Sequence, residues 1–167
     1  MAEISDLQKK MYENGRKVEE YFIELAERDG FKCLRANNYQ DRYEHWDVLL
    51  IKDDKSARVD VKGYKDAHQS GFTWIEFQTV DGEIGWIRGK AHAIAFERED
   101  CFELYNRKEL KKFIEKKIVN PTGYVFIKPN NLQEISYHRY RRMGRKDILV
   151  VVPFNDIEQF LLTKIMK

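Results

Sequence analysis

Hydrophobic positions along the chain recur with two spacings, one typical of helices and one typical of strands. Between residues 5 and 28 they return every three or four positions, which predicts a helix with one apolar face. These positions are Leu7, Met11, Val18, Phe22 and Leu25. Ser5 and Gln8 have the spacing of a capping box at the start of this helix, and Gly30 follows as a stop signal.

The other apolar positions mostly form short runs rich in β-branched and aromatic residues, which predict strands. The predicted strands cover residues 31–35, 47–51, 57–62, 72–79, 84–87, 91–96, 102–105, 124–127 and 147–152. Two further helices are predicted at residues 106–118, begun by an Asn106–Glu109 capping box, and at residues 156–166. This order predicts an α/β fold with one central mixed sheet flanked by helices, and a length of 167 residues predicts a single domain, 1–167.

The composition excludes several classes of protein. A hydrophobic content of 43% with 35% charged residues is typical of a globular protein and not of a disordered one. The longest apolar run, residues 148–152, is too short to cross a bilayer, and the first residues resemble no secretory signal. Cys33 and Cys101 form no CxxC motif, so a disulfide scaffold and a zinc finger are not expected. We expect a cytoplasmic protein without membrane contact.

Two carboxylates interrupt the apolar runs where strands are predicted. Asp47 begins one run, and Asp60 lies inside the next, with Lys62 two positions further on. Because side chains alternate along a strand, Asp60 and Lys62 share one face while Val59 and Val61 occupy the other. A hairpin that joins the two runs brings Asp47 beside Asp60, so the two carboxylates are expected to lie close together.

A pair of buried like charges is costly unless a cation compensates it. Mg²⁺ or Mn²⁺ is the natural candidate, since hard cations prefer carboxylate oxygen. A neighbouring lysine can stabilise charge that develops on a phosphate or help to activate the attacking water. Asp47, Asp60 and Lys62 therefore predict a metal-dependent phosphodiesterase centre. The ordinary alternative is that Asp47 ends a strand at the surface and that Asp60 and Lys62 form the polar face of a half-exposed strand.

Asp47, twelve intervening residues and then Asp60-Val61-Lys62 resemble the motif of the PD-(D/E)xK nuclease superfamily, which has the restriction-endonuclease-like fold. The segment Gly15–Glu19 is similar to the opening of archaeal Holliday-junction resolvases and related phage nucleases. The resemblance implies that Glu19 joins Asp47 and Asp60 in binding Mg²⁺ or Mn²⁺. The alternative for Glu19 is a solvated helix charge. Trp46 departs from the pattern, because the superfamily name has proline before the first aspartate.

The resemblance also implies an activity: Mg²⁺-dependent hydrolysis of DNA phosphodiester bonds by an endonuclease. Its catalytic residues are then Asp47, Asp60, Lys62 and Glu19. Junction resolvases of this fold act as symmetric dimers, so a Holliday-junction-like substrate and a homodimer are options, as is a phage-encoded protein in its host's cytoplasm. The alternative is a nucleic-acid-binding module of the same fold that has lost turnover. His92 favours that alternative, since phage-type relatives have aspartate there, whereas the complete Asp47, Asp60 and Lys62 set disfavours it.

Basic and amide side chains elsewhere are candidates for contact with nucleic acid. Residues 137–146 interleave aromatic residues with cations, and these cations are Arg139, Arg141, Arg142, Arg145 and Lys146. Guanidinium forks suit phosphate oxygens, and neutralised phosphates provide most non-specific affinity. Gln78 and Lys90 are further candidates close to the motif. The alternative is that all of these form ordinary solvated surface, and Trp74 and Trp86 are expected to pack rather than to bind.

Overall fold

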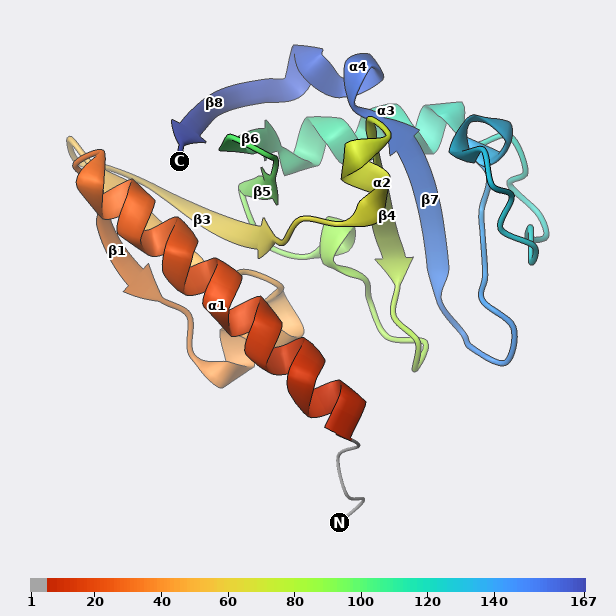
Figure 1. The fold of residues 1–167 in the computed structure, drawn as a ribbon, viewed down its shortest axis with the longest axis horizontal. Coiled ribbons are helices and arrows are strands. Elements are labelled where there is room, and N and C mark those ends of the chain that lie inside the picture. The colour runs from red at the N-terminus through yellow and green to blue at the C-terminus, as the bar shows by residue number, and fades with distance from the viewer. Residues whose placement is uncertain (1–5) are drawn as a thin grey trace.

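The computed structural model describes residues 6–167 (Figure 1). Its long helices are α1 (Asp6–Arg28) and α3 (Arg107–Lys117), and its single-turn helices are α2 (Asp66–Gln69) and α4 (Phe154–Ile157). The helix predicted at residues 5–28 is thus confirmed as α1, while the capping box at Ser5 and Gln8 lies outside the described side chains. The Asn106 side chain accepts a hydrogen bond from the Glu109 backbone N–H, which confirms the predicted start of α3. None of the described helices is long and apolar enough to span a membrane.

Six strands form the main sheet in the order β1-β2-β3-β5-β6-β8, and β4 and β7 form a separate antiparallel pair. The strands are β1 (Lys32–Arg35), β2 (Val48–Lys52), β3 (Lys55–Lys62), β4 (Phe72–Gln78), β5 (Ala93–Glu97), β6 (Cys101–Asn106), β7 (Ile148–Pro153) and β8 (Leu161–Met166). β3 and β5 run parallel, and the other neighbours in the main sheet run antiparallel. The mixed α/β class is confirmed, but two sheets replace the single sheet predicted.

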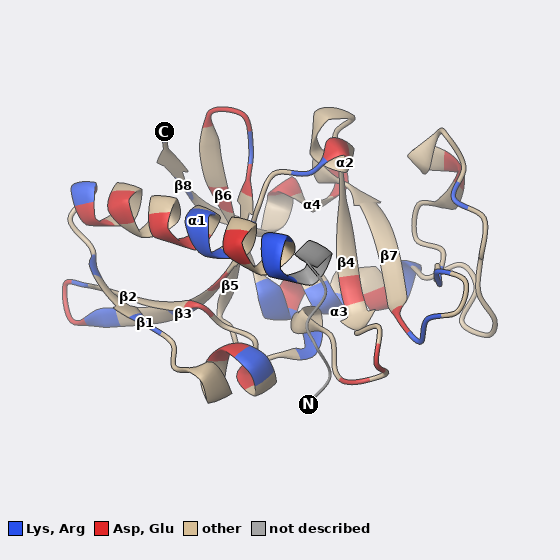
Figure 2. Cartoon of the chain, turned by 60° about the horizontal axis from the view of Figure 1, so that its bottom comes forward, with Lys and Arg blue, Asp and Glu red and all other residues tan. Residues whose placement is uncertain are grey.

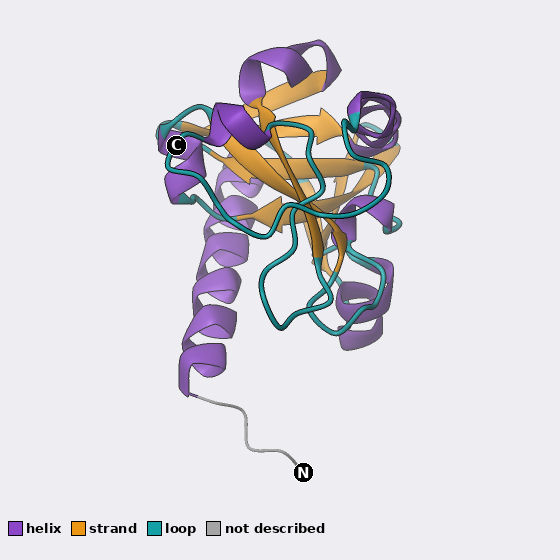
Figure 3. Cartoon of the chain, turned by 90° about the vertical axis from the view of Figure 1, so that its right-hand side faces the viewer, coloured by secondary structure: helices purple, strands orange, loops and turns teal. Residues whose placement is uncertain are grey.

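Each face of the main sheet carries its own hydrophobic core. On one face, Phe22, Leu25 and Ala26 of α1 pack against residues that include Val48 and Val59, and Figure 3 shows α1 as the long helix along one side of the strands. On the other face, Ile94 and Phe96 of β5 belong to a core that also contains side chains of β4, β7 and α3. Because Asp60 is paired with Ile94 across β3 and β5, it points away from α1 and into this second layer.

The segment 156–166 corrects the sequence prediction, which placed a helix there with Ile157, Phe160, Leu161 and Ile165 on one face. It instead forms the end of α4, a 3₁₀ turn at Glu158–Phe160, and β8. β8 pairs with β6, and Ile165 stands opposite Phe102. A bare β6 would leave a row of backbone N–H and C=O groups unpaired, so the requirement of the sheet edge outweighs the local helical spacing.

Two shorter predicted strands are also wrong. Residues 84–87 form one isolated bridge at Ile84 and then a 3₁₀ turn, Trp86–Arg88, in which Trp86 and Ile87 are both buried. Consecutive residues of a strand point to opposite faces, so a turn buries this pair more readily. Residues 124–127 form only an isolated bridge, between Val125 and Tyr140, and leave Ile127 exposed. The π-helix Gln40–Glu44 and the helix α2 had no counterpart in the sequence prediction.

Candidate active site

The β2–β3 hairpin brings Asp47 next to Asp60, as the alternation of residues predicted. Val48 of β2 pairs with Val59 of β3. Because the two strands are antiparallel, Asp47 and Asp60 are the next pair of positions along them. The Asp47 backbone N–H donates to the Val59 carbonyl oxygen at 2.9 Å. Asp47 Oδ2 accepts a hydrogen bond from the Val61 backbone N–H at 2.6 Å. The Asp47 carboxylate is therefore fixed against β3 beside Asp60.

Asp60 is buried, with 2% of its surface exposed, and its two oxygens differ. Oδ1 lies 2.7 Å from the Lys62 ammonium, whereas Oδ2 is buried without a hydrogen-bond partner among the described residues. The Lys62 side chain keeps 27% of its surface exposed, and its ammonium lies 5.1 Å from the ring centroid of Trp86. A buried oxygen without a donor is rare and costly, so Asp60 Oδ2 is a place where a cation or a donor can be accommodated.

The two carboxyls affect each other's protonation in opposite ways: Asp60 raises the pKa of Asp47, whereas the hydrogen bond with Asp47 lowers the pKa of Asp60. Burial and the charge of Asp60 raise the pKa of Asp47 from 3.8 to about 8. Burial also raises the pKa of Asp60, although the neighbouring Lys62 opposes this shift. Burial alone would lower the pKa of Lys62, but Asp60 and Asp47 together raise it, so the lysine is charged at neutral pH. The cluster therefore favours a second positive charge, carried by a proton or by a metal ion.

Glu19 approaches the pair from α1 without joining it. Its carboxylate accepts a hydrogen bond from the Arg35 guanidinium at 3.3 Å. Burial and the charges of Asp47 and Asp41 raise its pKa to about 7. Within residues 6–167, no three His, Cys, Asp or Glu side chains are grouped closely enough to hold a metal ion. Mg²⁺ commonly binds through one or two carboxylates plus water and phosphate, so Asp47 and Asp60 fit such an ion in the kind of donor they offer.

Most arginines of the basic segment form hydrogen bonds or ion pairs with other residues of the chain. Arg139 donates to the Tyr124 hydroxyl at 2.9 Å, and Arg141 donates to the Asp147 carbonyl oxygen at 3.1 Å. The Arg142 guanidinium and backbone N–H both donate to the side chain of Asp147, which is fully buried. These three residues, predicted as nucleic-acid contacts, therefore have structural partners, and Arg142 alone of them also lines a cleft beside Lys62.

The other predicted contact residues lie on loops around this region. Arg145 and Lys146 are exposed at a turn before β7. Gln78 uses its amide to donate to the Lys146 carbonyl oxygen at 2.7 Å, and the Lys90 ammonium pairs with Glu44 at 2.8 Å. Figure 2 shows acidic and basic residues interspersed along α1, so the charges there form no purely basic stripe.

His92 is tied to Arg58 and not to the carboxylate pair. Its Nδ1 accepts a hydrogen bond from the Arg58 backbone N–H at 2.9 Å, and its Nε2 lies 3.2 Å from the Arg58 guanidinium. Since Ala93 pairs with Val59, His92 is one position short of that pair. It therefore lies just before β5, where its backbone N–H donates to the Arg58 carbonyl oxygen, and it does not reach Asp60.

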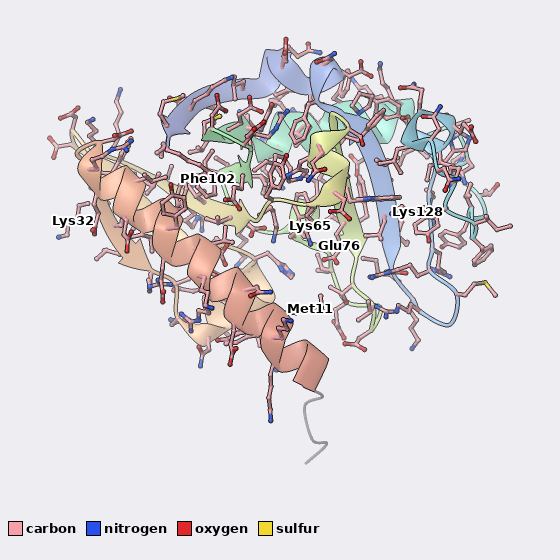
Figure 4. All side chains as sticks on the ribbon, in the orientation of Figure 1. Met11, Lys32, Lys65, Glu76, Phe102 and Lys128 are labelled. Atoms are coloured by element: carbon pink, nitrogen blue, oxygen red, sulfur yellow. The ribbon has the colours of Figure 1, made fainter. Side chains whose placement is uncertain are left out.

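A cleft of about 490 Å³, here named the Lys62 cleft, opens beside the cluster. The side chains that matter most for its chemistry are Lys62, Lys65, Trp74, Lys128, Tyr140 and Arg142. Figure 4 labels three of its lining residues. Lys65 comes from the loop after β3, Glu76 from β4, and Lys128 from the loop that precedes the basic segment. No sequence pattern marked Lys65 or Lys128 as a contact residue, although Lys65 follows the motif lysine by only three positions.

Taken as chemistry, the site offers two oxygen donors, one lysine that reaches solvent, and an adjoining cleft rich in cations. Such a set can hold a cation and the phosphate group of a nucleic acid. Burial raises the pKa of Glu76 in the cleft, while the charges of Lys62 and Arg142 partly oppose the shift. Comparisons with profiles of known protein families, with curated proteins and with solved structures gave no match.

Proposed function

We propose that the protein is a Mg²⁺- or Mn²⁺-dependent endonuclease that hydrolyses DNA phosphodiester bonds. The observation that carries the proposal is the buried Asp60 carboxylate, with one oxygen on Lys62 and the other without a partner, next to the Asp47 carboxyl. A purely structural role leaves this arrangement unexplained, because burying two acids together costs stability.

Asp47 and Asp60 would hold the metal ion, and Glu19 would assist from α1. When bound, the ion would neutralise charge on the scissile phosphate and lower the pKa of water. Lys62 can turn its ammonium toward a phosphate oxygen, because part of its side chain is exposed and its stem is anchored in β3. It would thereby stabilise the negative charge that develops as the phosphodiester bond breaks.

A restriction-endonuclease-like fold is part of this proposal. In its favour, α1 packs on the strands that carry Asp47 and Asp60, and the motif strand β3 lies at the centre of a mixed sheet beside parallel β5. A Holliday-junction-like substrate and a symmetric dimer belong to the same proposal, since a dimer would provide one site for each of two strands.

The second candidate is a nucleic-acid-binding module of the same fold without turnover. Two observations favour it: Lys62 already neutralises Asp60, and residues 6–167 contain no third ligand grouped with the two acids. In that case the cluster would serve binding alone, and divalent cations would be dispensable.

A cleavage assay separates the two candidates. The purified protein would be given supercoiled plasmid, single-stranded DNA and a four-way junction, each with Mg²⁺, Mn²⁺ or EDTA. The expected result is metal-dependent cutting that Asp60→Ala abolishes and that Asp81→Ala, a change of an exposed acid in a turn, preserves. Circular dichroism would check that both variants fold. Cutting by a folded Asp60→Ala variant would refute the proposal, and binding without cutting would favour the second candidate.

A further inference from the structure

The Lys62 cleft joins an aromatic surface to a group of cations. Trp74 of β4 is half-buried, and its ring lies 5.3 Å from that of Tyr140 at an interplanar angle of 44°. The Lys128 ammonium lies 5.9 Å from the Trp74 ring centroid. Partly exposed indole rings are effective platforms for bases, because every base has a flat face that can stack.

Positive charge dominates the same cleft. Lys62, Lys65, Lys128 and Arg142 line it, and Glu76 is the acid among its lining residues. Among the described residues, Lys65 and Lys128 form no ion pair, so their ammonium groups are available to a ligand. Burial and the charges of Lys62 and Arg142 lower the pKa of Lys65, as expected where cations gather. These charges suit the phosphates of a nucleic acid that runs along the cleft.

The size and position of the cleft limit which nucleic acid can use it. A volume of about 490 Å³ lies within the range of roughly 300–1,000 Å³ that is usual for ligand pockets. Bases paired in a duplex are stacked on their neighbours, so their faces cannot lie on Trp74. Lys62 belongs to both the cleft and the Asp60 cluster, so a nucleotide in the cleft would be adjacent to the phosphate at the cluster.

We infer that the Lys62 cleft binds an unpaired nucleotide of DNA, with its base stacked on Trp74 and its phosphates held by Lys65, Lys128 and Arg142. The inference rests on the proposed function for its choice of DNA, and it extends that function by naming the substrate class. The substrates are DNA molecules with an unpaired segment next to the cut, such as flaps, gaps, bubbles and opened junctions. Intact duplex is then the poorer ligand.

The test is a binding measurement in EDTA, which does not require cleavage. Fluorescence anisotropy would compare labelled oligothymidylate with a labelled duplex of equal length. Trp74→Ala is expected to weaken binding of the single strand about tenfold and to leave duplex binding nearly unchanged. Trp74→Phe, which keeps a stacking face, should recover most of the loss. Lys128→Gln should weaken single-strand binding and its salt dependence, whereas the exposed Lys32→Gln on β1 should not (Figure 4).

Several outcomes would overturn the inference. Unchanged single-strand affinity in a folded Trp74→Ala variant is one, and an equal loss for duplex is another. Tighter binding of oligouridylate than of oligothymidylate through Trp74 would overturn the assignment to DNA. The proposed nuclease activity can fail independently of the cleft. If the protein cuts no substrate but Trp74→Ala weakens single-strand binding, the cleft assignment stands and the nuclease proposal is refuted. If the protein cuts DNA but Trp74→Ala leaves single-strand binding unchanged, the nuclease proposal stands and the cleft assignment is refuted.

Discussion

Lys62 Nζ lies 2.7 Å from Asp60 Oδ1, although the two residues belong to one strand and are separated by a single position. Their side chains meet because positions two apart on a strand share a face. The pair neutralises one oxygen of a fully buried carboxylate and leaves the other oxygen unpartnered. In the metal-free protein, Asp60 and Lys62 therefore contribute to stability as well as to the catalysis that we propose.

Lys62→Gln should lower both stability and cleavage. The change leaves Asp60 buried without its cation, which costs about 1–3 kcal/mol, or several degrees in Tm. Mg²⁺ should restore part of the loss, since it would replace the missing positive charge. Cleavage should fall by about 10²-fold or more even in saturating Mg²⁺. Thermal unfolding with EDTA or Mg²⁺ and a cleavage time course would measure these effects, with the exposed Lys55→Gln at the start of the same strand as control.

Asp47→Asn should change how stability depends on pH in the absence of metal. The folded protein holds the Asp47 proton more tightly than the unfolded chain, because the pKa is raised from 3.8 to about 8. This contribution is fully present below about pH 4 and is lost as the pH rises through about 8. Asparagine does not ionise, so the variant should match the wild type below about pH 4, become progressively more stable than it between about pH 4 and pH 8, and keep that advantage above pH 8. Urea unfolding of both proteins in EDTA, from below pH 4 to about pH 9, would measure this difference in stability. If the stabilities of the variant and the wild type changed equally with pH, the raised pKa of Asp47 would be contradicted.

Arg142 and Arg145 should behave differently although they lie in one basic segment. Arg142→Gln removes the guanidinium partner of fully buried Asp147 and should cost about 1–3 kcal/mol, although the Arg142 backbone N–H still donates to that carboxylate. Arg145 is exposed, so Arg145→Gln should change stability by less than about 0.5 kcal/mol and should reduce only the salt-dependent part of DNA affinity. Chemical unfolding and DNA binding at two salt concentrations would distinguish them. Equal losses of stability would contradict the structural role of Arg142.

β8 offers a direct check of the corrected C-terminal segment. Ile165 is 1% exposed against Phe102, whereas Leu162 is 58% exposed. Ile165→Ala should therefore cost about 2–4 kcal/mol, and Leu162→Ala should be nearly neutral. Leu161 is only half-buried, so Leu161→Ala should cost less than Ile165→Ala. A helix over residues 156–166 with both residues inward would instead make the two changes equally costly. Tm values of the alanine variants would decide between the two structures.

The acidic cluster could be predicted because its signals are local. Strand alternation fixes the common face of Asp60 and Lys62, and a short hairpin fixes the position of Asp47. The Lys62 cleft could not be predicted in the same way, since Lys65, Trp74 and Lys128 come from three segments that only tertiary packing brings together. Trp74 was expected to pack, and it does pack against Tyr140 and the core around Val151, although part of its surface stays exposed.

The errors in the fold have the same origin. The helical spacing after residue 156 is real, but the edge of β6, far away in sequence, decides the conformation of Leu161–Met166. In the basic segment, Arg139 pairs with Tyr124 of an earlier loop, whereas Arg142 pairs with the buried Asp147 only five positions away. Composition predicts cations there but not which of them are already engaged.

The pairing of β6 with β8 also constrains how the molecule is made. On the ribosome, a nascent chain that has emerged only as far as Lys117 contains β6 but not the strand that covers its edge. That edge stays open to other chains until residues 161–166 arrive, and contacts of such long sequence separation form slowly. Truncation before Leu161 should therefore favour aggregation over a smaller folded product, and chaperones that shield β-edges would matter most during this interval of synthesis.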